Sequence, residues 1–478
     1  MKSATAARNA AWVGSTTIVR YVISFVFSAL LARTLGSESY GTYALAISLV
    51  SVVLVLAGSG FRMITVRDVA RDFENAQRYV VTTLGLQSVV LLACLLLLIA
   101  GGLTLGYTRE LIGFAALLGI AQGISNAIAL PMSVFIAREW MGVWSIFQTV
   151  QKVVLSAVVL GAVYLTGDLY ALAYPSIGVN ALFLVVAVAL FHRYVSPVEG
   201  RAIRLDTQLI RYLVRETAPL LISGVAYVLY RRVDKILLSQ FTSNTAVIGW
   251  YGLAFNLYFT ALTASDAYTR VLFPSMSRFP LNTDHALNLL GVSMRHMLVL
   301  GVGFVVSVVV LADVFLPLLF GEGFSNSINC LRILSLGFVV NAVSTVFGNR
   351  LVSTGKQSWV AKAVFAALLA NVISNLILMP NYLHVGAAIS VVVGESVYLL
   401  IVFSATERKE EVLHQLAEYG LKASVAGGVM ALVLWIMHPL SLLASVPLGL
   451  IAYLLAAKLT GAITKDDLRK ATTVFLTR

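Results

Sequence analysis

The sequence has few of the residues that build soluble domains, disulfide scaffolds or metal centres. Only 12% of its 478 residues are charged and two are cysteine, whereas 59% are hydrophobic and the mean hydropathy is +0.89. Such a composition is typical of membrane proteins. Cys94 and Cys330 both lie in or beside apolar runs. This placement suggests neither a disulfide framework nor a cysteine-based metal site.

Catalytic motifs are also scarce. The six histidines are scattered without metal-ligand spacing, and no G-x-S-x-G, H-E-x-x-H or Walker pattern occurs. We therefore expect no enzyme activity, no cofactor and no ATP hydrolysis by this chain. A membrane-embedded glycan polymerase or ligase would need a long outer loop with catalytic arginine or histidine, and the predicted outer loops are too short for one.

Long apolar runs dominate the sequence and predict an all-α integral membrane protein, because about 20 apolar residues suffice for one helical span. Fourteen runs are present, at residues 12–35, 39–61, 79–103, 110–136, 143–166, 168–191, 213–240, 246–268, 296–320, 328–349, 358–380, 383–404, 419–437 and 440–460. They suggest an N-lobe at 1–191, a basic linker at 192–212, a C-lobe at 213–404, and a peripheral helix pair with a tail at 405–478.

An internal repeat supports two six-helix lobes. Gly41–Ala46 and Gly249–Ala254 share the pattern G-x-Y-x-L-A at the start of the second and eighth predicted helices. A weaker echo pairs Asn126-Ala127-Ile128 with Asn341-Ala342-Val343. Because six is an even number, the lobes would share one orientation, as parallel repeats do. Lobes of this kind commonly enclose a site and rock about it.

The basic residues predict the orientation of the chain, since Lys and Arg concentrate in cytoplasmic loops. Of the 34 Lys and Arg residues, 22 lie in segments on the N-terminal side of the membrane and one, Arg109, lies on the other side. Both termini are therefore expected in the cytoplasm. The net charge of +12 is spread over these segments, which favours anionic lipid headgroups as partners over nucleic acid.

The seventh run carries charges that need an explanation. Arg231, Arg232, Asp234 and Lys235 lie in its outer half, and charges at bilayer depth usually face a protein interior or a wet cavity. The run could instead end at Tyr230, with the charges at the outer interface. Asp234 could neutralise Arg231 or couple transport to an ion, but one carboxylate against three cations still leaves the cluster positive. Guanidinium groups suit phosphate and carboxylate oxygens, so we expect an anionic substrate.

Other embedded charges extend the candidate site. Arg20 lies near the middle of the first run, where its head group cannot easily reach either surface, whereas Arg33 and Arg332 lie near outer ends and could snorkel. Glu395 lies near the middle of the twelfth run. A carboxylate at that depth is either a proton or ion group or the partner of a nearby cation. Lys152, about ten residues into its helix, remains ambiguous.

Several motifs resemble those of the Wzx-type polysaccharide flippases of the multidrug/oligosaccharidyl-lipid/polysaccharide exporter superfamily. They are Ala32–Tyr43, Arg231–Leu238 with Asp234 inside, Gly249–Asn256, Thr269–Pro274 with Arg270 inside, Leu319–Phe324, Thr354-Gly355-Lys356, and Gly386–Ile389 leading to Glu395. Their order and the number of helices are jointly specific, and the resemblance covers nearly the whole chain.

The resemblance implies a flippase of the inner membrane that moves a polyprenyl-diphosphate-linked oligosaccharide to the outer leaflet by alternating access. Nothing in the sequence demands more than a monomer. It implies a cationic central cavity, and a proton or sodium gradient coupled through Asp234 or Glu395. The expected substrate-binding residues are Arg20, Arg33, Arg231, Arg232, Lys235, Arg270 and Arg332. A polysaccharide polymerase is a possible partner. The alternatives are a multidrug exporter of the same fold, whose cavity would be dominated by acids, and a peptidoglycan-precursor flippase, which would differ in substrate alone.

Overall fold

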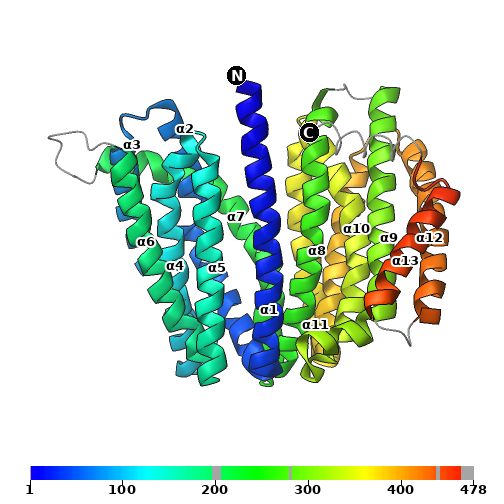
Figure 1. The fold of residues 1–478 in the computed structure, drawn as a ribbon, viewed down its shortest axis with the longest axis horizontal. Coiled ribbons are helices and arrows are strands. Elements are labelled where there is room, and N and C mark those ends of the chain that lie inside the picture. The colour runs from blue at the N-terminus through cyan, green and yellow to red at the C-terminus, as the bar shows by residue number, and fades with distance from the viewer. Residues whose placement is uncertain (1, 196–205, 279–282, 438–441, 465–478) are drawn as a thin grey trace. The chain divides into compact units, whose positions relative to one another are not determined.

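The computed structural model describes residues 2–195, 206–278, 283–437 and 442–464. All regular elements among these residues are helices (Figure 1). Residues 196–205 of the basic linker and residues 465–478 of the predicted tail lie outside the described residues. The chain forms two compact units, Met1–Ile236 and Leu237–Arg478, and each is described by itself below.

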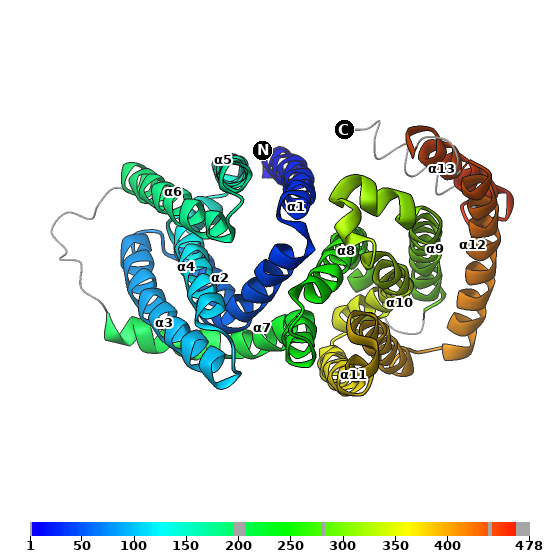
Figure 2. The same ribbon diagram turned by 90° about the horizontal axis from the view of Figure 1, so that it is seen from below.

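The first unit is built around α4. It contains α1 (Lys2–Leu54), α2 (Ser59–Arg71), α3 (Ala76–Thr104), α4 (Arg109–Ala137), α5 (Met141–Thr166), α6 (Ala173–Tyr194) and most of α7 (Thr207–Phe241), with short 3-10 turns at Val55–Ala57 and Leu169–Leu172. In the end-on view, α4 lies among α2, α3 and α6, and it also contacts α1 and α5 (Figure 2). Aromatic and aliphatic side chains of α4, α5 and α6 fill the space between them, including Phe135, Phe147 and Phe183.

The second unit is built around α10. It contains α8 (Thr245–Arg278), α9 (Asp284–Phe320), α10 (Ser327–Ser353), α11 (Gln357–Ser404), α12 (Lys409–Met437) and α13 (Leu442–Leu459), with a 3-10 turn at Glu322–Phe324. α10 packs against α8, α9 and α11. α12 and α13 pack against each other and against α9, so the last helix pair is attached through one helix of the unit.

The expected helices are confirmed. Within the described residues, ten helical stretches are long and apolar enough to cross a membrane, or eleven with the bent α7. Two of them, Trp12–Arg71 and Gln357–Ser404, each contain two of the expected spans, and a shorter apolar helix lies at Ala444–Leu459. These stretches account for the fourteen runs.

Two backbone features turn the chain between paired spans. Gly36 has φ +71° inside α1, a conformation that glycine adopts without steric cost. Leu383 has φ +44° inside α11 and follows Pro380 by three residues. Beyond that turn, a Cβ added to Gly386 would lie 2.8 Å from the carbonyl oxygen of Leu378. Only glycine allows this approach, which explains the Gly386-Ala387-Ala388 motif physically.

The boundary between the compact units differs from the boundary expected between the lobes. The sequence placed the seventh helix in the second lobe, whereas the first compact unit extends through α7 to Ile236. The reason lies at the start of α7, where Leu209 and Leu213 are buried against Ile64 of α2. The division into two lobes that move during transport stays a prediction.

Candidate functional site

A polar cavity of about 560 Å³ lies in the first unit between α1, α4 and α5. Its lining comprises Thr17, Arg20, Tyr21, Ser24, Gln122, Ser125, Gln148, Gln151, Lys152 and Leu155. Two of these ten described residues are cations and none is acidic. The volume is in the range of small-molecule sites, and the lining combines positive charge with amide and hydroxyl groups. Such a lining suits an anionic group that carries hydroxyls.

Arg20 is held in this cavity by neutral partners. Its Nη1 donates to Gln148 Oε1 at 2.5 Å and its Nη2 donates to Thr17 Oγ1 at 3.1 Å. The guanidinium carbon lies 5.5 Å from the centre of the Trp144 ring, a cation–π distance. These contacts orient the guanidinium without cancelling its charge. The part of Arg20 in substrate binding stays a prediction.

Lys152 is the second cation of the cavity, and its role is ambiguous from the sequence alone. Its Nζ lies 5.4 Å from the centre of the Phe27 ring of α1. Gln148, Gln151 and Lys152 are spaced i, i+3 and i+4, so they share one face of α5 and line the cavity together. This spacing of polar residues inside an apolar run was the signal that could have identified them.

A buried amide supports the cavity wall from α6. Asn180 donates through Nδ2 to the carbonyl oxygen of Ala121 at 3.0 Å and accepts from Gln151 Nε2 at 3.1 Å. Both bonds are made inside the helix bundle, where an unpaired polar group is costly. Asn180 therefore fixes the direction in which Gln151 points.

We expect Asn180→Ala to lower the free energy of unfolding by about 1–3 kcal/mol, because it leaves the Ala121 carbonyl and the Gln151 amide without these partners. Thermal unfolding of the purified protein in detergent measures the loss. Asn126→Ala is the matched control, since Asn126 pairs with the exposed Gln122, and it should change stability much less. Equal stability of both variants would contradict this role of Asn180.

The cationic cluster of α7 is buried to different degrees. Asp234 and Lys235 are 0% and 3% exposed, whereas Arg231 and Arg232 are half-buried. Arg231 donates through Nη1 to Tyr227 Oη at 2.8 Å. These residues belong to the first unit but do not line the cavity around Arg20. Their part in substrate binding stays a prediction.

The cluster lies close to the second half of α1. Arg232 interacts electrostatically with Tyr40 and Tyr43, and Tyr43 belongs to the repeated G-x-Y-x-L-A motif. Lys235 interacts with Asp234, as well as with the two arginines. The carboxylate of Asp234 thus neutralises part of the positive charge, and the cluster as a whole remains positive.

The remaining expected cations lie near the surface. Arg33 and Arg270 are exposed. Arg332 donates through Nε to the carbonyl oxygen of Val309 at 3.1 Å, and its Nη2 lies 3.8 Å from Asp313 Oδ2. Their assignment to the substrate site also stays a prediction.

Glu395 lies in a buried polar cluster of the second unit. It is 4% exposed and accepts hydrogen bonds from Tyr258 Oη at 3.3 Å and from Asn341 Nδ2 at 3.0 Å. The three side chains come from α11, α8 and α10. A buried carboxylate needs such partners, and it could also bind a proton. Asn341 is the residue that the weaker sequence echo pairs with Asn126, which contacts the cavity residue Gln122 in the first unit.

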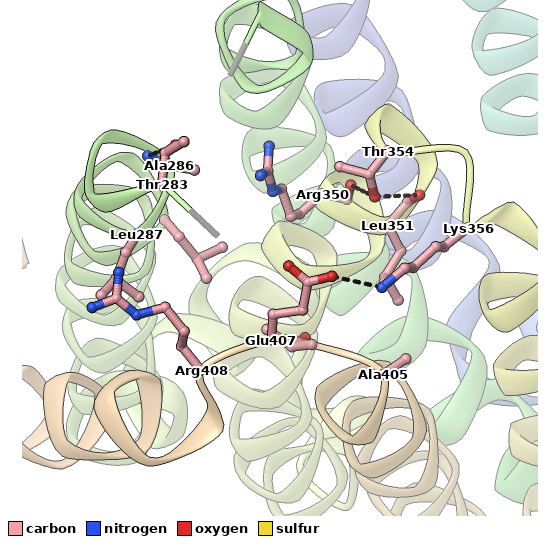
Figure 3. Close-up of a pocket in the computed structure, with 12 residues that line it drawn as sticks. Thr283, Ala286, Leu287, Arg350, Leu351, Thr354, Lys356, Ala405, Glu407 and Arg408 are labelled. Atoms are coloured by element: carbon pink, nitrogen blue, oxygen red, sulfur yellow. Dashed lines mark hydrogen bonds and ion pairs between the residues drawn. The ribbon is translucent and has the colours of Figure 1, made fainter. Parts of the chain in front are cut away.

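A smaller cavity in the second unit contains ion pairs (Figure 3). It has a volume of about 40 Å³, room for little more than water. Lys356 Nζ lies 2.8 Å from Glu407 Oε1, and Arg408 contacts Asp284 at 2.6 Å and Glu411 at 2.5 Å. Hydrogen bonds to Glu411 and then Asp284 raise the pKa of the Arg408 guanidinium. Arg350, a third cation of the lining, donates through Nη1 to the carbonyl oxygen of Met276 at 2.7 Å. These contacts connect the ends of neighbouring helices.

The bundle of long apolar helices and the charged cavity define a polytopic membrane protein of the transporter type. Residues 6–280 match the family described as polysaccharide biosynthesis protein. Because this match covers more than half of the chain, the protein belongs to that family. None of the curated proteins matches the sequence.

Several solved structures have the same fold. The lipid II flippase MurJ, in an inward closed conformation, superimposes with a TM-score of 0.73 at 12% identity, covering 93% of this chain and 97% of that one. The eukaryotic MATE transporter AtDTX14 superimposes with a TM-score of 0.59 at 15% identity, and the alignment covers 86% of this chain and 98% of that one. An inward-facing multidrug resistance MATE family transporter of the MOP superfamily superimposes with a TM-score of 0.57 at 15% identity, and the alignment covers 84% of this chain and 98% of that one. These identities are low, and the three structures therefore show the fold alone.

Proposed function

We propose that the protein is a flippase that moves a polyprenyl-diphosphate-linked oligosaccharide from the cytoplasmic to the outer leaflet of the inner membrane by alternating access. The observation that carries this proposal is the cavity of the first unit, where Arg20 and Lys152 stand among amides and hydroxyls without an acidic lining residue. Diphosphate oxygens or acidic sugars match the cations, and neutral sugars match the amides. Membership of a polysaccharide biosynthesis family supports the same reading.

The multidrug exporter is a weaker candidate. An exporter of organic cations needs acidic groups in its cavity, whereas the lining around Arg20 has the opposite charge. A peptidoglycan-precursor flippase fits the charge equally well, because its substrate also carries a diphosphate. The two flippases would differ in the sugar that the diphosphate carries, so a transport assay with each substrate distinguishes them.

The buried Glu395 is our candidate for coupling transport to a proton or sodium gradient, and Asp234 is the second candidate. Glu395 is held by Tyr258 and Asn341, both neutral, so a change in its charge would alter the electrostatics of the second unit. We further propose a monomer with both termini in the cytoplasm, which functions with a polysaccharide polymerase acting on the delivered substrate.

The test is a direct measurement of flipping. We expect proteoliposomes that contain the purified protein to move a fluorescent polyprenyl-diphosphate-linked oligosaccharide across the bilayer, so that an added quencher reaches it on the opposite side. A lipid-linked disaccharide-pentapeptide and a cationic dye serve as competing substrates. Movement of the dye with no movement of either lipid-linked sugar would refute the proposal and favour the exporter.

A further inference from the structure

The first part of α7 is attached to α2 by a polar network of four residues, Arg67, Asp68, Tyr212 and Glu216, here called the α7 clamp. Arg67 uses all parts of its guanidinium group, with Nε 2.8 Å from Asp68 Oδ1, Nη1 3.0 Å from Glu216 Oε2, and Nη2 2.6 Å from Tyr212 Oη. Tyr212 donates in turn to Asp68 Oδ2 at 3.0 Å. The clamp therefore closes a ring of contacts between the two helices.

A narrow apolar strip lies beside the clamp. Leu209 and Leu213 are buried against Ile64, and Thr217 continues the same helix face toward Gly60. At the start of α7, Asp206 pairs with Arg78. The backbone N–H of Leu209 and the Arg78 guanidinium hold the pKa of Asp206 below its usual range. The first half of α7 is thus held by a few apolar contacts and several polar ones.

α7 is bent immediately after this attached part. Its two helical pieces, Thr207–Ile222 and Gly224–Phe241, meet at an angle of 43°. Pro219 lies within the helix and removes one backbone donor from the helical ladder, and proline or glycine is the usual cause of a sharp helix bend. The bend divides α7 into two helical pieces that run in different directions. The angle also decides where Arg231 and Lys235, in the second piece, are directed.

The clamp has the strength expected of a reversible contact. The side chains of Arg67 and Glu216 are 36% and 39% exposed, and solvent-exposed ion pairs contribute little to stability. Asp68, by contrast, is only 7% exposed at its side chain and depends on Arg67 and Tyr212 for its hydrogen bonds. Such a network holds one position of α7 without making it permanent, as a conformational switch requires.

We propose that the α7 clamp is a latch, which holds the first half of α7 on α2 in the bent state and opens during each transport cycle so that α7 can change its bend near residues 222–224. Arg67 acts as a positioning residue, since it touches the α7 helix and not the candidate cavity. This inference concerns the motion of a helix and does not depend on which substrate is carried.

A disulfide across the interface tests the latch. A Cβ added to Gly60 would lie 3.7 Å from the Cβ of Thr217, close to the mean separation of about 3.8 Å in disulfides. We would introduce Gly60→Cys and Thr217→Cys together, with the native Cys94 and Cys330 replaced by alanine. Oxidation should reduce flipping at least tenfold and dithiothreitol should restore it, whereas oxidation should not change flipping by the single variant Thr217→Cys. Gly60→Cys alone is no control, because its Cβ would lie 2.3 Å from Thr217 Cγ2. Full cross-linking with an unchanged flipping rate would overturn the proposal.

The rate of cross-linking gives a second readout that needs no substrate. Adding Arg67→Gln to the cysteine pair should slow disulfide formation in membranes severalfold, because α7 spends less time on α2. Arg71→Gln is the matched control, since Arg71 is an exposed arginine of the same helix, and it should leave the rate unchanged. Equal rates in both would overturn the latch. If the reduced protein moves no lipid-linked sugar, the proposed function fails and the cross-linking rates alone decide on the latch.

Discussion

Arg20→Ala is expected to reduce transport of the lipid-linked substrate by about 10- to 100-fold. A charge-assisted hydrogen bond contributes about 1.5–3 kcal/mol, and each 1.4 kcal/mol is about a tenfold change. Arg20 reaches the cavity from the middle of α1, and its partners Gln148 and Thr17 are neutral. Removal of the guanidinium therefore leaves no buried charge behind. Protein level and thermal stability should stay close to those of the wild type.

Surface polysaccharide in cells that lack the chromosomal copy measures this effect, with the amount of membrane protein determined in parallel. Arg20→Lys is the matched variant, because it keeps the charge and loses the planar fork that binds oxygen atoms in pairs. The amount of surface polysaccharide made with Arg20→Lys should lie between the amounts made with Arg20→Ala and with the wild type. Wild-type polysaccharide from Arg20→Ala at normal expression would remove Arg20 from the site.

Glu395→Gln is expected to abolish the response of transport to the ion gradient. The amide keeps the shape of the side chain and an oxygen that accepts from Asn341, but it cannot ionise. Glu395→Ala is the contrasting variant, because Tyr258 and Asn341 would both lose their acceptor. It should also lower the free energy of unfolding by about 1–3 kcal/mol.

Proteoliposomes with imposed proton or sodium gradients measure the effect of Glu395→Gln. The wild type should flip the lipid-linked substrate faster with one of the two gradients than without a gradient. The variant should flip it at the same rate in all conditions. A variant whose gradient response equals that of the wild type would eliminate Glu395 as the coupling group. The same experiment on Asp234→Asn would then test the second candidate.

The helices could be predicted from the sequence because the length of an apolar run is set by the thickness of the bilayer. The turn at Gly36 and the turn after Pro380 fall where the sequence separates adjacent spans. The repeated motif also has a structural counterpart, since Leu45 and Ala46 are buried in the first unit and Leu253 and Ala254 in the second. Local sequence patterns therefore predict most of the helices and the turns between them.

The candidate site was only partly predictable. Arg20 stood out because a cation at mid-span is rare, whereas Gln148 and Gln151 carry no charge and did not interrupt an apolar run. Their role follows from tertiary packing, which brings α1, α4 and α5 around one cavity. The attachment of α7 to α2 also depends on tertiary packing, because Arg67 contacts residues more than 140 positions away.

The central claim is that Arg20 and Lys152 create a cavity that binds an anionic headgroup. The most direct measurement is the affinity of the purified protein for a short-chain polyprenyl-diphosphate-linked oligosaccharide, compared between wild type and the double variant Arg20→Gln/Lys152→Gln. We predict that the double variant binds at least tenfold more weakly and that salt weakens binding of the wild type more than that of the variant. Equal affinity of the two proteins, with equal dependence on salt, would contradict the claim.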